Sequence, residues 1–138
     1  MQLEVKISLI LHATENQEKV LSYLEQIFNI EQNDFQIQQI PGHFNNPILL
    51  ISSSLKKKVA ETFIKKFFSM MEKNEYKEIF NNVEDFVSSS GLNLRISKQK
   101  ILSEIISLSK EDAIKININT PVYVKNQIKK TYQELIEI

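Results

Sequence analysis

The chain of 138 residues contains no cysteine, no tryptophan and only two glycines. The absence of cysteine excludes disulfide bonds, thiol catalysis and thiolate metal sites, and it fits a reducing compartment. The longest apolar runs, such as residues 48–51, are far shorter than the roughly 20 residues of a membrane span. The start, MQLEVKISL, also lacks the regions of a signal peptide. We therefore expect a soluble, cytoplasmic protein with no membrane partner.

The known enzyme motifs are also missing from the sequence. There is no Walker loop, dinucleotide-binding glycine pattern, HExxH or nucleophile elbow, and two glycines cannot supply the usual phosphate loops. We expect no enzymatic activity and no cofactor. His12, Glu15 and His43 have the chemistry of metal ligands, but their spacing matches no standard site. A metal-dependent hydrolase that uses His12 and His43 is therefore a minor alternative, and a loop hydrogen bond is the preferred interpretation of His12.

Charge is balanced in total but sorted along the chain. The formal net charge is zero, which argues against indiscriminate binding of polyanions. Residues 1–40 are mainly acidic, and the basic residues gather in later blocks. Those blocks contain Lys56, Lys57, Lys58, Lys65, Lys66 and Lys73, then Arg95, Lys98 and Lys100, then Lys115, Lys125, Lys129 and Lys130. One face of the molecule can therefore be basic although the total charge is zero.

The hydrophobic pattern predicts alternating strands and helices. Period-2 alternation predicts strands at residues 3–11, 92–96 and 114–118, and further strands are expected at 35–40, 48–51 and 101–108. Apolar stripes predict helices at about 15–28, 55–71, 76–87 and 124–136. Thr14 and Gln17 match a capping box for the first helix. Residues 1–138 are expected to form one α+β domain, a largely antiparallel sheet with helices packed on it.

Lys56, Lys57 and Lys58 are unusual because they stand at a predicted helix start. Cations there oppose the helix dipole and weaken the helix slightly. Free N–H groups and ammonium groups together favour a bound phosphate. A solvated lysine face on an amphipathic helix is the equally weighted alternative.

Two further segments have residue types that bind nucleic acids. In PGHFNNPI, residues 41–48, His43, Phe44 and Asn46 can stack on or hydrogen-bond to an unpaired base. A plain turn, with Phe44 folded back over the sheet, is the simpler interpretation of that segment. In LRISKQK, residues 94–100, Arg95, Ser97 and Gln99 are expected on one strand face with Lys98 near the strand end. Such a basic strand edge is either ordinary surface or a groove that follows a phosphate backbone.

Three segments in order resemble a known family: LHATENQEKV at 11–20, GHFNNPI at 42–48 and GLNLRISKQ at 91–99. They resemble the archaeal RNA-binding family described as a predicted exosome subunit. The resemblance implies a fold similar to the large-subunit ribosomal protein that binds 5S rRNA, an RNA-related role, and no established enzymatic activity.

The chain departs from that family's pattern at two places. In the central loop, Phe44 and Asn45 stand where the family has a second histidine and a glycine, while His43, Asn46 and Pro47 match. In the later strand, Ile96-Ser97 replace Phe-Asp before Lys98-Gln99. Arg95, Lys98 and Gln99 carry over from the pattern, and any role of the acidic residue does not.

We therefore expect a non-catalytic RNA-binding protein that takes part in RNA processing or in the archaeal exosome. The expected contact residues are His43, Phe44, Asn46, Lys56, Lys57, Lys58, Arg95, Lys98 and Gln99. The expected partners are RNA and RNA-processing proteins. The alternative is a protein–protein adaptor or a homodimeric interaction module without direct RNA contact, in which the acidic and basic helices meet oppositely charged partners.

Overall fold

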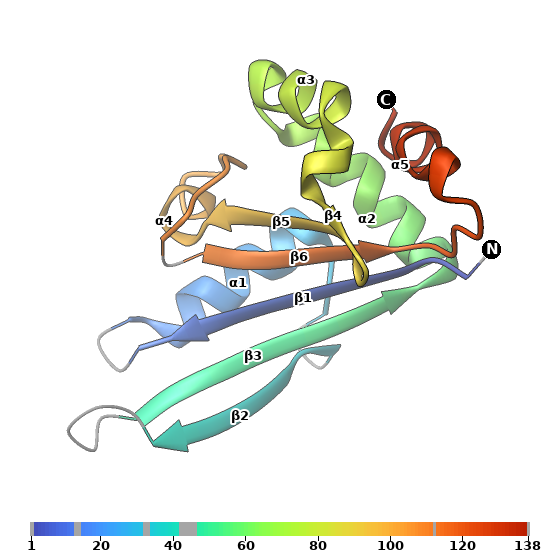
Figure 1. The fold of residues 1–138 in the computed structure, drawn as a ribbon. Coiled ribbons are helices and arrows are strands. Elements are labelled where there is room, and N and C mark those ends of the chain that lie inside the picture. The colour runs from blue at the N-terminus through green and yellow to red at the C-terminus, as the bar shows by residue number, and fades with distance from the viewer. Residues whose placement is uncertain (1, 13–14, 32–33, 42–46, 112, 138) are drawn as a thin grey trace.

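The fold is organised around an antiparallel sheet (Figure 1). The structure, a computed structural model, describes residues 2–12, 15–31, 34–41, 47–111 and 113–137. Within these residues the sheet has six strands in the order β2-β3-β1-β6-β5-β4. The strands are β1 (Glu4–Leu11), β2 (Gln36–Pro41), β3 (Pro47–Lys56), β4 (Val87–Ser88), β5 (Gly91–Ser97) and β6 (Ala113–Asn119).

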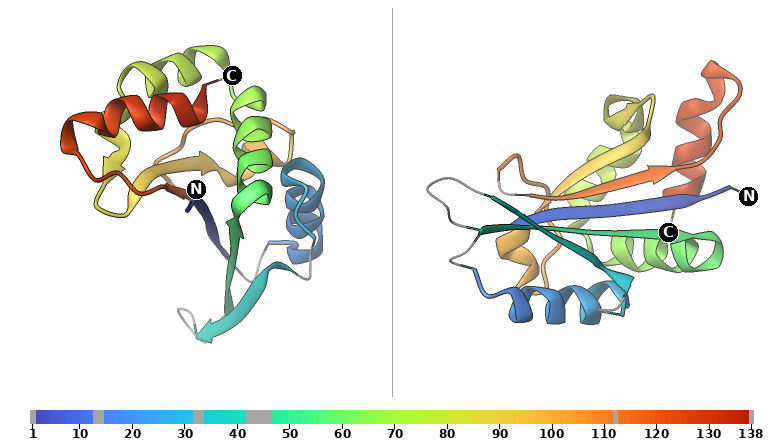
Figure 2. Two further views of the ribbon diagram at one scale, coloured as in Figure 1. Left: turned by 90° about the vertical axis from the view of Figure 1, so that its right-hand side faces the viewer. Right: turned by 90° about the horizontal axis from the view of Figure 1, so that it is seen from below.

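Helices form the second layer. They are α1 (Gln17–Phe28), α2 (Lys57–Met70), α3 (Lys73–Asn81), α4 (Lys98–Ile101) and α5 (Ile128–Ile136), with short 3-10 helices η3 (Val83–Phe86) and η4 (Lys125–Gln127). α1 and α2 lie on one side of the sheet, whereas α3 and α5 pack together near its β4 edge (Figures 1 and 2). The expected α+β architecture with a largely antiparallel sheet is confirmed. None of these helices is long and apolar enough to cross a membrane.

Alternation along the strands sets the two faces of the sheet. In β1, Val5, Ile7, Leu9 and Leu11 are buried, and the residues between them are half-buried or exposed. β5 and β6 repeat this pattern from their own sequences. Because successive side chains of a strand point to opposite faces, the buried set meets the helices and the other set points away from them.

An aromatic cluster joins the helices over the core face. The rings of Phe28 in α1 and Phe63 in α2 lie 5.0 Å apart, and the Phe67 ring lies 5.5 Å from that of Phe63. The contacts continue through Phe68 to Tyr76 in α3 at 6.0 Å. Edge-on and offset rings at such distances add about 0.5–1.5 kcal/mol per pair beyond the area that they bury. The phenylalanines of α2 thus stabilise the helix layer.

The predicted capping box is replaced by a neighbouring residue. α1 begins at Gln17, and its N-cap is Asn16, whose Oδ1 accepts a hydrogen bond from the Lys19 N–H at 3.1 Å. Thr14 lies outside the described residues. Asparagine is among the strongest N-cap residues, so the helix starts two residues later than a Thr14 cap implies.

The predicted strand at 101–108 is wrong. Ile101 ends α4, while Ile106 and Leu108 make isolated bridges to Met71 and Ile96. The segment is held by side chains from elsewhere, because the Glu75 carboxylate accepts hydrogen bonds from the Ser107 hydroxyl at 3.0 Å and the Leu108 N–H at 3.1 Å. It therefore docks on the edge of β5 without forming a strand.

Two helices are shorter than predicted. α3 ends at Asn81, with Asn82 as its C-cap, whose backbone and side-chain N–H groups both donate to the Glu78 carbonyl. The chain then passes through η3 into β4, so Val87 pairs with Leu92 in place of extending a helix. At the C-terminal end, Val124 precedes η4 and α5 begins only at Ile128.

Gly91 is the residue whose backbone the sheet constrains most directly. Its φ is +118°, and a Cβ there would lie 2.4 Å from the Ile118 carbonyl oxygen. We expect Gly91→Ala to lower the free energy of unfolding by more than about 1 kcal/mol, since alanine is strained at such an angle. Urea denaturation measures this change. The exposed neighbour Ser89→Ala is the control, expected to stay within about 0.5 kcal/mol, and an equal effect of both substitutions would contradict the argument.

Candidate nucleic-acid interface

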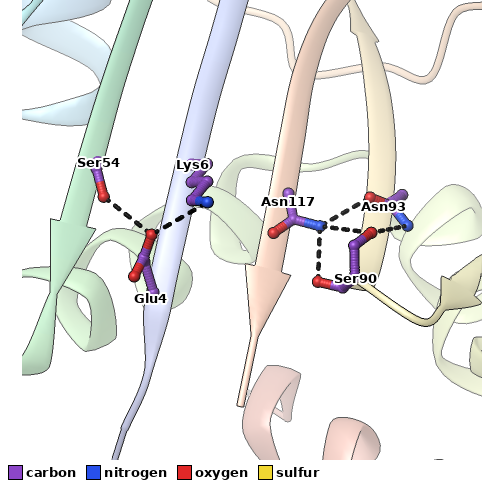
Figure 3. A network of polar contacts seen from close by, with 6 residues as sticks. All are labelled: Glu4, Lys6, Ser54, Ser90, Asn93 and Asn117. Atoms are coloured by element: carbon purple, nitrogen blue, oxygen red, sulfur yellow. Dashed lines mark hydrogen bonds and ion pairs between the residues drawn. The ribbon is translucent and has the colours of Figure 1, made fainter. Parts of the chain in front are cut away.

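One face of the sheet carries polar residues from four strands and faces away from α1 and α2 (Figures 1 and 3). We call it the open face. Its residues are Glu4, Lys6, Ser8 and Ile10 of β1, Ser52, Ser54 and Lys56 of β3, Asn93 and Arg95 of β5, and Lys115, Asn117 and Asn119 of β6. All of them are half-buried or exposed, as expected for side chains that do not meet the helix layer.

The open face holds two like charges directly opposite each other. Arg95 and Lys115 are partners in the β5–β6 register, and both are exposed. Among the described residues, neither side chain makes a hydrogen bond or an ion pair. Like charges at opposite positions of an antiparallel pair destabilise the sheet. An anion bound between the two side chains would attract both of them and offset their mutual repulsion.

Polar contacts hold other side chains of the open face in place (Figure 3). The Asn117 amide donates to Asn93 Oδ1 at 2.8 Å and to the Ser90 carbonyl at 3.1 Å. Glu4 accepts a hydrogen bond from the Ser54 hydroxyl at 3.2 Å and lies 3.6 Å from the Lys6 ammonium. The Lys6 side chain stays 67% exposed, so its ion pair with Glu4 is a surface pair of small energy.

The open face is hollowed at two places. A depression of about 330 Å³ lies over β1, β6 and β5. Its polar lining consists of Lys6, Ser8, Asn93, Arg95, Lys115 and Asn117. A second depression at the start of β1 is lined by Glu4, Lys56, Lys57 and Asn119, among others. The two depressions share one face of the sheet, and both have lysine in their walls.

The three consecutive lysines separate at the start of α2. Lys56 pairs with Glu4 in the β3–β1 register and so belongs to the open face, and Lys57 lines the depression beside it. Lys58 instead lines a hollow on the helix side with Glu31 and Asp34. The helix has no side-chain cap at Lys56 and no acidic residue in its first turn. The first turn of α2 therefore adds no negative charge against the helix dipole, and the nearby carboxylate is that of Glu4 in the same depression.

Lys57 also has an uncommon backbone conformation. Its φ is +56°, in the left-handed region that glycine and asparagine adopt at lower free energy than lysine. Its N–H donates to the Leu3 carbonyl at 3.3 Å. The turn from β3 into α2 thus keeps a lysine where the backbone alone would favour another residue.

Lys98 does not occupy the position expected of a phosphate ligand. It is 2% exposed, and its ammonium donates to the Ile10 carbonyl at 2.6 Å and to Glu15 Oε1 at 2.8 Å. The strand ends at Ser97, whose hydroxyl caps α4, so Lys98 turns inward. This cation ties α4 to the end of β1 and the region before α1.

The remaining predicted contact residues lie apart from this cluster or cannot be placed. Gln99 is exposed on α4, beyond the strand face on which it was expected beside Arg95. His43, Phe44 and Asn46 lie outside the described residues. The backbone N–H of His12 donates to Glu15 Oε1 at 3.0 Å, in agreement with a loop hydrogen bond.

Five polar residues that line the depression over β1, β6 and β5 were not among the contact residues expected from the sequence: Lys6, Ser8, Asn93, Lys115 and Asn117. Each occupies a polar position in a strand that alternation had identified. They could have been identified as the positions of those strands that point away from the core. Alternation does not show which strands are neighbours, however, and these residues lie together because β1, β6 and β5 are adjacent.

Comparison with known proteins shows similarity over nearly the whole chain. A family model described as RNA binding matches residues 4–120. The RNA-binding protein PAB1135 of Pyrococcus abyssi is 29% identical over 142 residues, which cover 96% of this chain and 92% of that protein. The solved structure of protein AF2318 from Archaeoglobus fulgidus has a TM-score of 0.78 at 26% identity, covering 98% of this chain and 99% of the other.

A second solved structure supports the fold alone. Mth689 of Methanothermobacter thermautotrophicus, described as a DUF54 protein, has a TM-score of 0.77 at 22% identity. The match covers 99% of this chain and 100% of the other. The same arrangement of strands and helices therefore occurs in archaeal proteins of quite different sequence.

The buried position of Lys98 predicts a role in folding stability, which can be tested. We expect Lys98→Met to lower the free energy of unfolding by about 2 kcal/mol, because the part-buried Ile10 carbonyl and the Glu15 carboxylate lose their charged donor. Denaturant titration measures the loss. Lys110→Met, on an exposed side chain, is the control and should change stability by less than about 0.5 kcal/mol. An unchanged stability for Lys98→Met would contradict the structural role.

Proposed function

The chain belongs to the RNA-binding family, and we propose that it binds RNA without catalysing a reaction, through the cations of its open face. The observation that carries this proposal is the Arg95–Lys115 pair, two exposed like charges held opposite each other. A phosphate between them would accept hydrogen bonds from both and remove their repulsion. Lys6 and Lys56 extend the same basic surface across β1 and β3.

The start of α2 adds a second element to the proposed interface. Free N–H groups and the helix dipole favour an anion there, and Lys56 and Lys57 bring ammonium groups to the same depression. This site is continuous with the open face, so one RNA molecule can contact both. Lys58 faces Glu31 and Asp34 on the other side and contributes less in this arrangement.

Further contacts in the proposal come from the segments that carry the family resemblance. His43, Phe44 and Asn46 would offer rings and amide groups to unpaired bases at the loop between β2 and β3. Gln99 would add a polar contact from α4. Lys98 would act indirectly, by positioning the end of β1 near Ile10.

The proposal extends to RNA processing. Association with the archaeal exosome and a likeness to the ribosomal protein that binds 5S rRNA rest on the family resemblance in residues 11–20, 42–48 and 91–99. Incubation with purified archaeal exosome, with and without ribonuclease, distinguishes direct protein contact from tethering by RNA. Co-elution that survives ribonuclease would support a protein contact, and no co-elution in either condition would contradict exosome association.

The first test concerns the open face. We expect the double variant Arg95→Glu/Lys115→Glu to weaken RNA binding at least about tenfold. It should also reduce the slope of log affinity against log salt concentration by about 1.5–2, since two phosphate contacts are lost. Fluorescence anisotropy over a salt series measures both quantities.

The matched control for this test is Lys129→Glu/Lys130→Glu, which reverses two exposed charges on α5. Its net charge change equals that of the open-face variant. If the two variants weakened RNA affinity equally, the affinity would depend on the net charge of the protein and not on the open face.

The second test uses the separation of the three lysines. We expect Lys56→Glu/Lys57→Glu to weaken RNA binding about tenfold or more, whereas Lys58→Glu should have a smaller effect per charge. The adaptor alternative predicts the opposite outcome. If reversal of these charges altered self-association in analytical ultracentrifugation and left RNA affinity unchanged, the homodimeric interaction module would be favoured.

A further inference from the structure

Lys115, Lys6 and Lys56 of the open face lie on one diagonal of the sheet, and Arg95 stands directly opposite the first of them. The register places Lys115 opposite Arg95 and next to Ser8, and Ser8 is two residues from Lys6 on β1. Lys6 lies opposite Ser54, which is two residues from Lys56 on β3. Each step from Lys115 to Lys6 and from Lys6 to Lys56 therefore moves one strand across and two residues along.

This geometry gives one short step, from Arg95 to Lys115, and two longer diagonal steps. Diagonal neighbours of an antiparallel sheet are about 7–8 Å apart, and directly opposite residues about 5 Å. The line from Arg95 through Lys115 and Lys6 to Lys56 is thus roughly 20 Å long. That is too long for one phosphate group. It fits a chain of phosphates that crosses the strands obliquely.

Hydroxyl and amide groups border the same diagonal. Ser8 and Asn117 lie beside the step from Lys115 to Lys6, and Ser54 lies beside the step from Lys6 to Lys56. Serine and asparagine side chains bind both phosphate oxygens and ribose hydroxyl groups. The Glu4 carboxylate also borders the second step, opposite Lys56 and 3.6 Å from the Lys6 ammonium, and the Ser54 hydroxyl donates to it. Apart from this one acidic group, the side chains along the path are of the kinds that contact a sugar–phosphate backbone.

The open face has no aromatic side chain in the described strands. Phe28, Phe63, Phe67 and Phe68 are buried in the helix layer. Among the described aromatic residues, Tyr123 is the exposed one, at 92%, and it follows the end of β6. Proteins that hold single-stranded RNA stack its bases on aromatic rings. On this face the bases would have no such partner.

We propose that the open face binds double-helical RNA, with one sugar–phosphate strand running along the diagonal from Arg95 to Lys56. The bases stay paired and stacked with one another, because this face offers no ring on which an unpaired base could stack. The protein then recognises the helix by its backbone and its ribose hydroxyl groups, which the shallow minor groove of A-form RNA displays. This inference rests on the proposed RNA binding and specifies its substrate class and path.

The experiment compares three labelled probes of one sequence: an RNA duplex of about 16–20 base pairs, its separate strands, and the matching DNA duplex. Anisotropy is measured for the wild type, Lys6→Glu, Lys6→Gln and the control Lys77→Glu on α3. Circular dichroism checks that each variant is folded. Lys6→Gln keeps the test usable if the reversal of charge beside Glu4 perturbs the strand.

We expect the RNA duplex to bind at least about tenfold more tightly than either single strand or the DNA duplex. Lys6→Gln should reduce the salt slope by about 1, and Lys6→Glu by at least as much. Lys77→Glu should change neither quantity by as much. Tyr123→Ala, which removes an exposed ring outside the open face, should leave duplex affinity unchanged.

Other outcomes separate the two proposals. Tighter binding of single strands, lost in Phe44→Ala or Tyr123→Ala, would overturn the duplex inference and leave RNA binding intact. Duplex binding that depends on Arg95 and Lys115 but is unaffected by both Lys6 variants would overturn the diagonal path. Failure to bind any of the RNA probes would count against the proposed function itself.

Discussion

The register of β1 between β3 and β6 is the constraint on which the molecule depends. A shift of one residue in a strand moves every side chain to the opposite face of the sheet. In the observed register, Val5, Ile7 and Leu9 enter the core while Lys6 and Ser8 stay outside it. The same pairing therefore fixes both the hydrophobic core and the arrangement of cations on the open face.

The way in which aromatic residues are used links the core to the proposed substrate. The phenylalanines of α1 and α2 contact one another across the core side of the sheet, as the 5.0 Å separation of the Phe28 and Phe63 rings shows. The strands contribute aliphatic residues to the core and polar residues to the open face. This division leaves a sheet surface suited to charge and hydrogen bonding, and it favours recognition of a backbone over recognition of unpaired bases.

Much of the fold is readable from the sequence, because its main strands each bury one face. Strict alternation identified β1, β5 and β6, and apolar stripes identified α1 and α2. The prediction for residues 101–108 was wrong because their apolar pattern fits either a helix or a strand. The actual conformation depends on hydrogen bonds that Ser107 and Leu108 donate to the carboxylate of Glu75, which is distant in sequence. Lys98 was misplaced for a related reason, since its partners Ile10 and Glu15 come from the other end of the chain. Of the residues in the candidate site, Arg95 and Lys56 were expected from the sequence, whereas the addition of Lys6 and Lys115 requires the strand order.

The separation of the two faces of β1 also affects how this protein can evolve. Outward residues such as Lys6 and Ser8 make few contacts with the helix layer, so their replacement changes surface chemistry with little effect on folding stability. Replacement of inward neighbours such as Ile7 lowers folding stability, because protein interiors are close-packed. Selection can therefore adjust the surface chemistry of the open face one outward residue at a time, while the core and the scaffold stay the same.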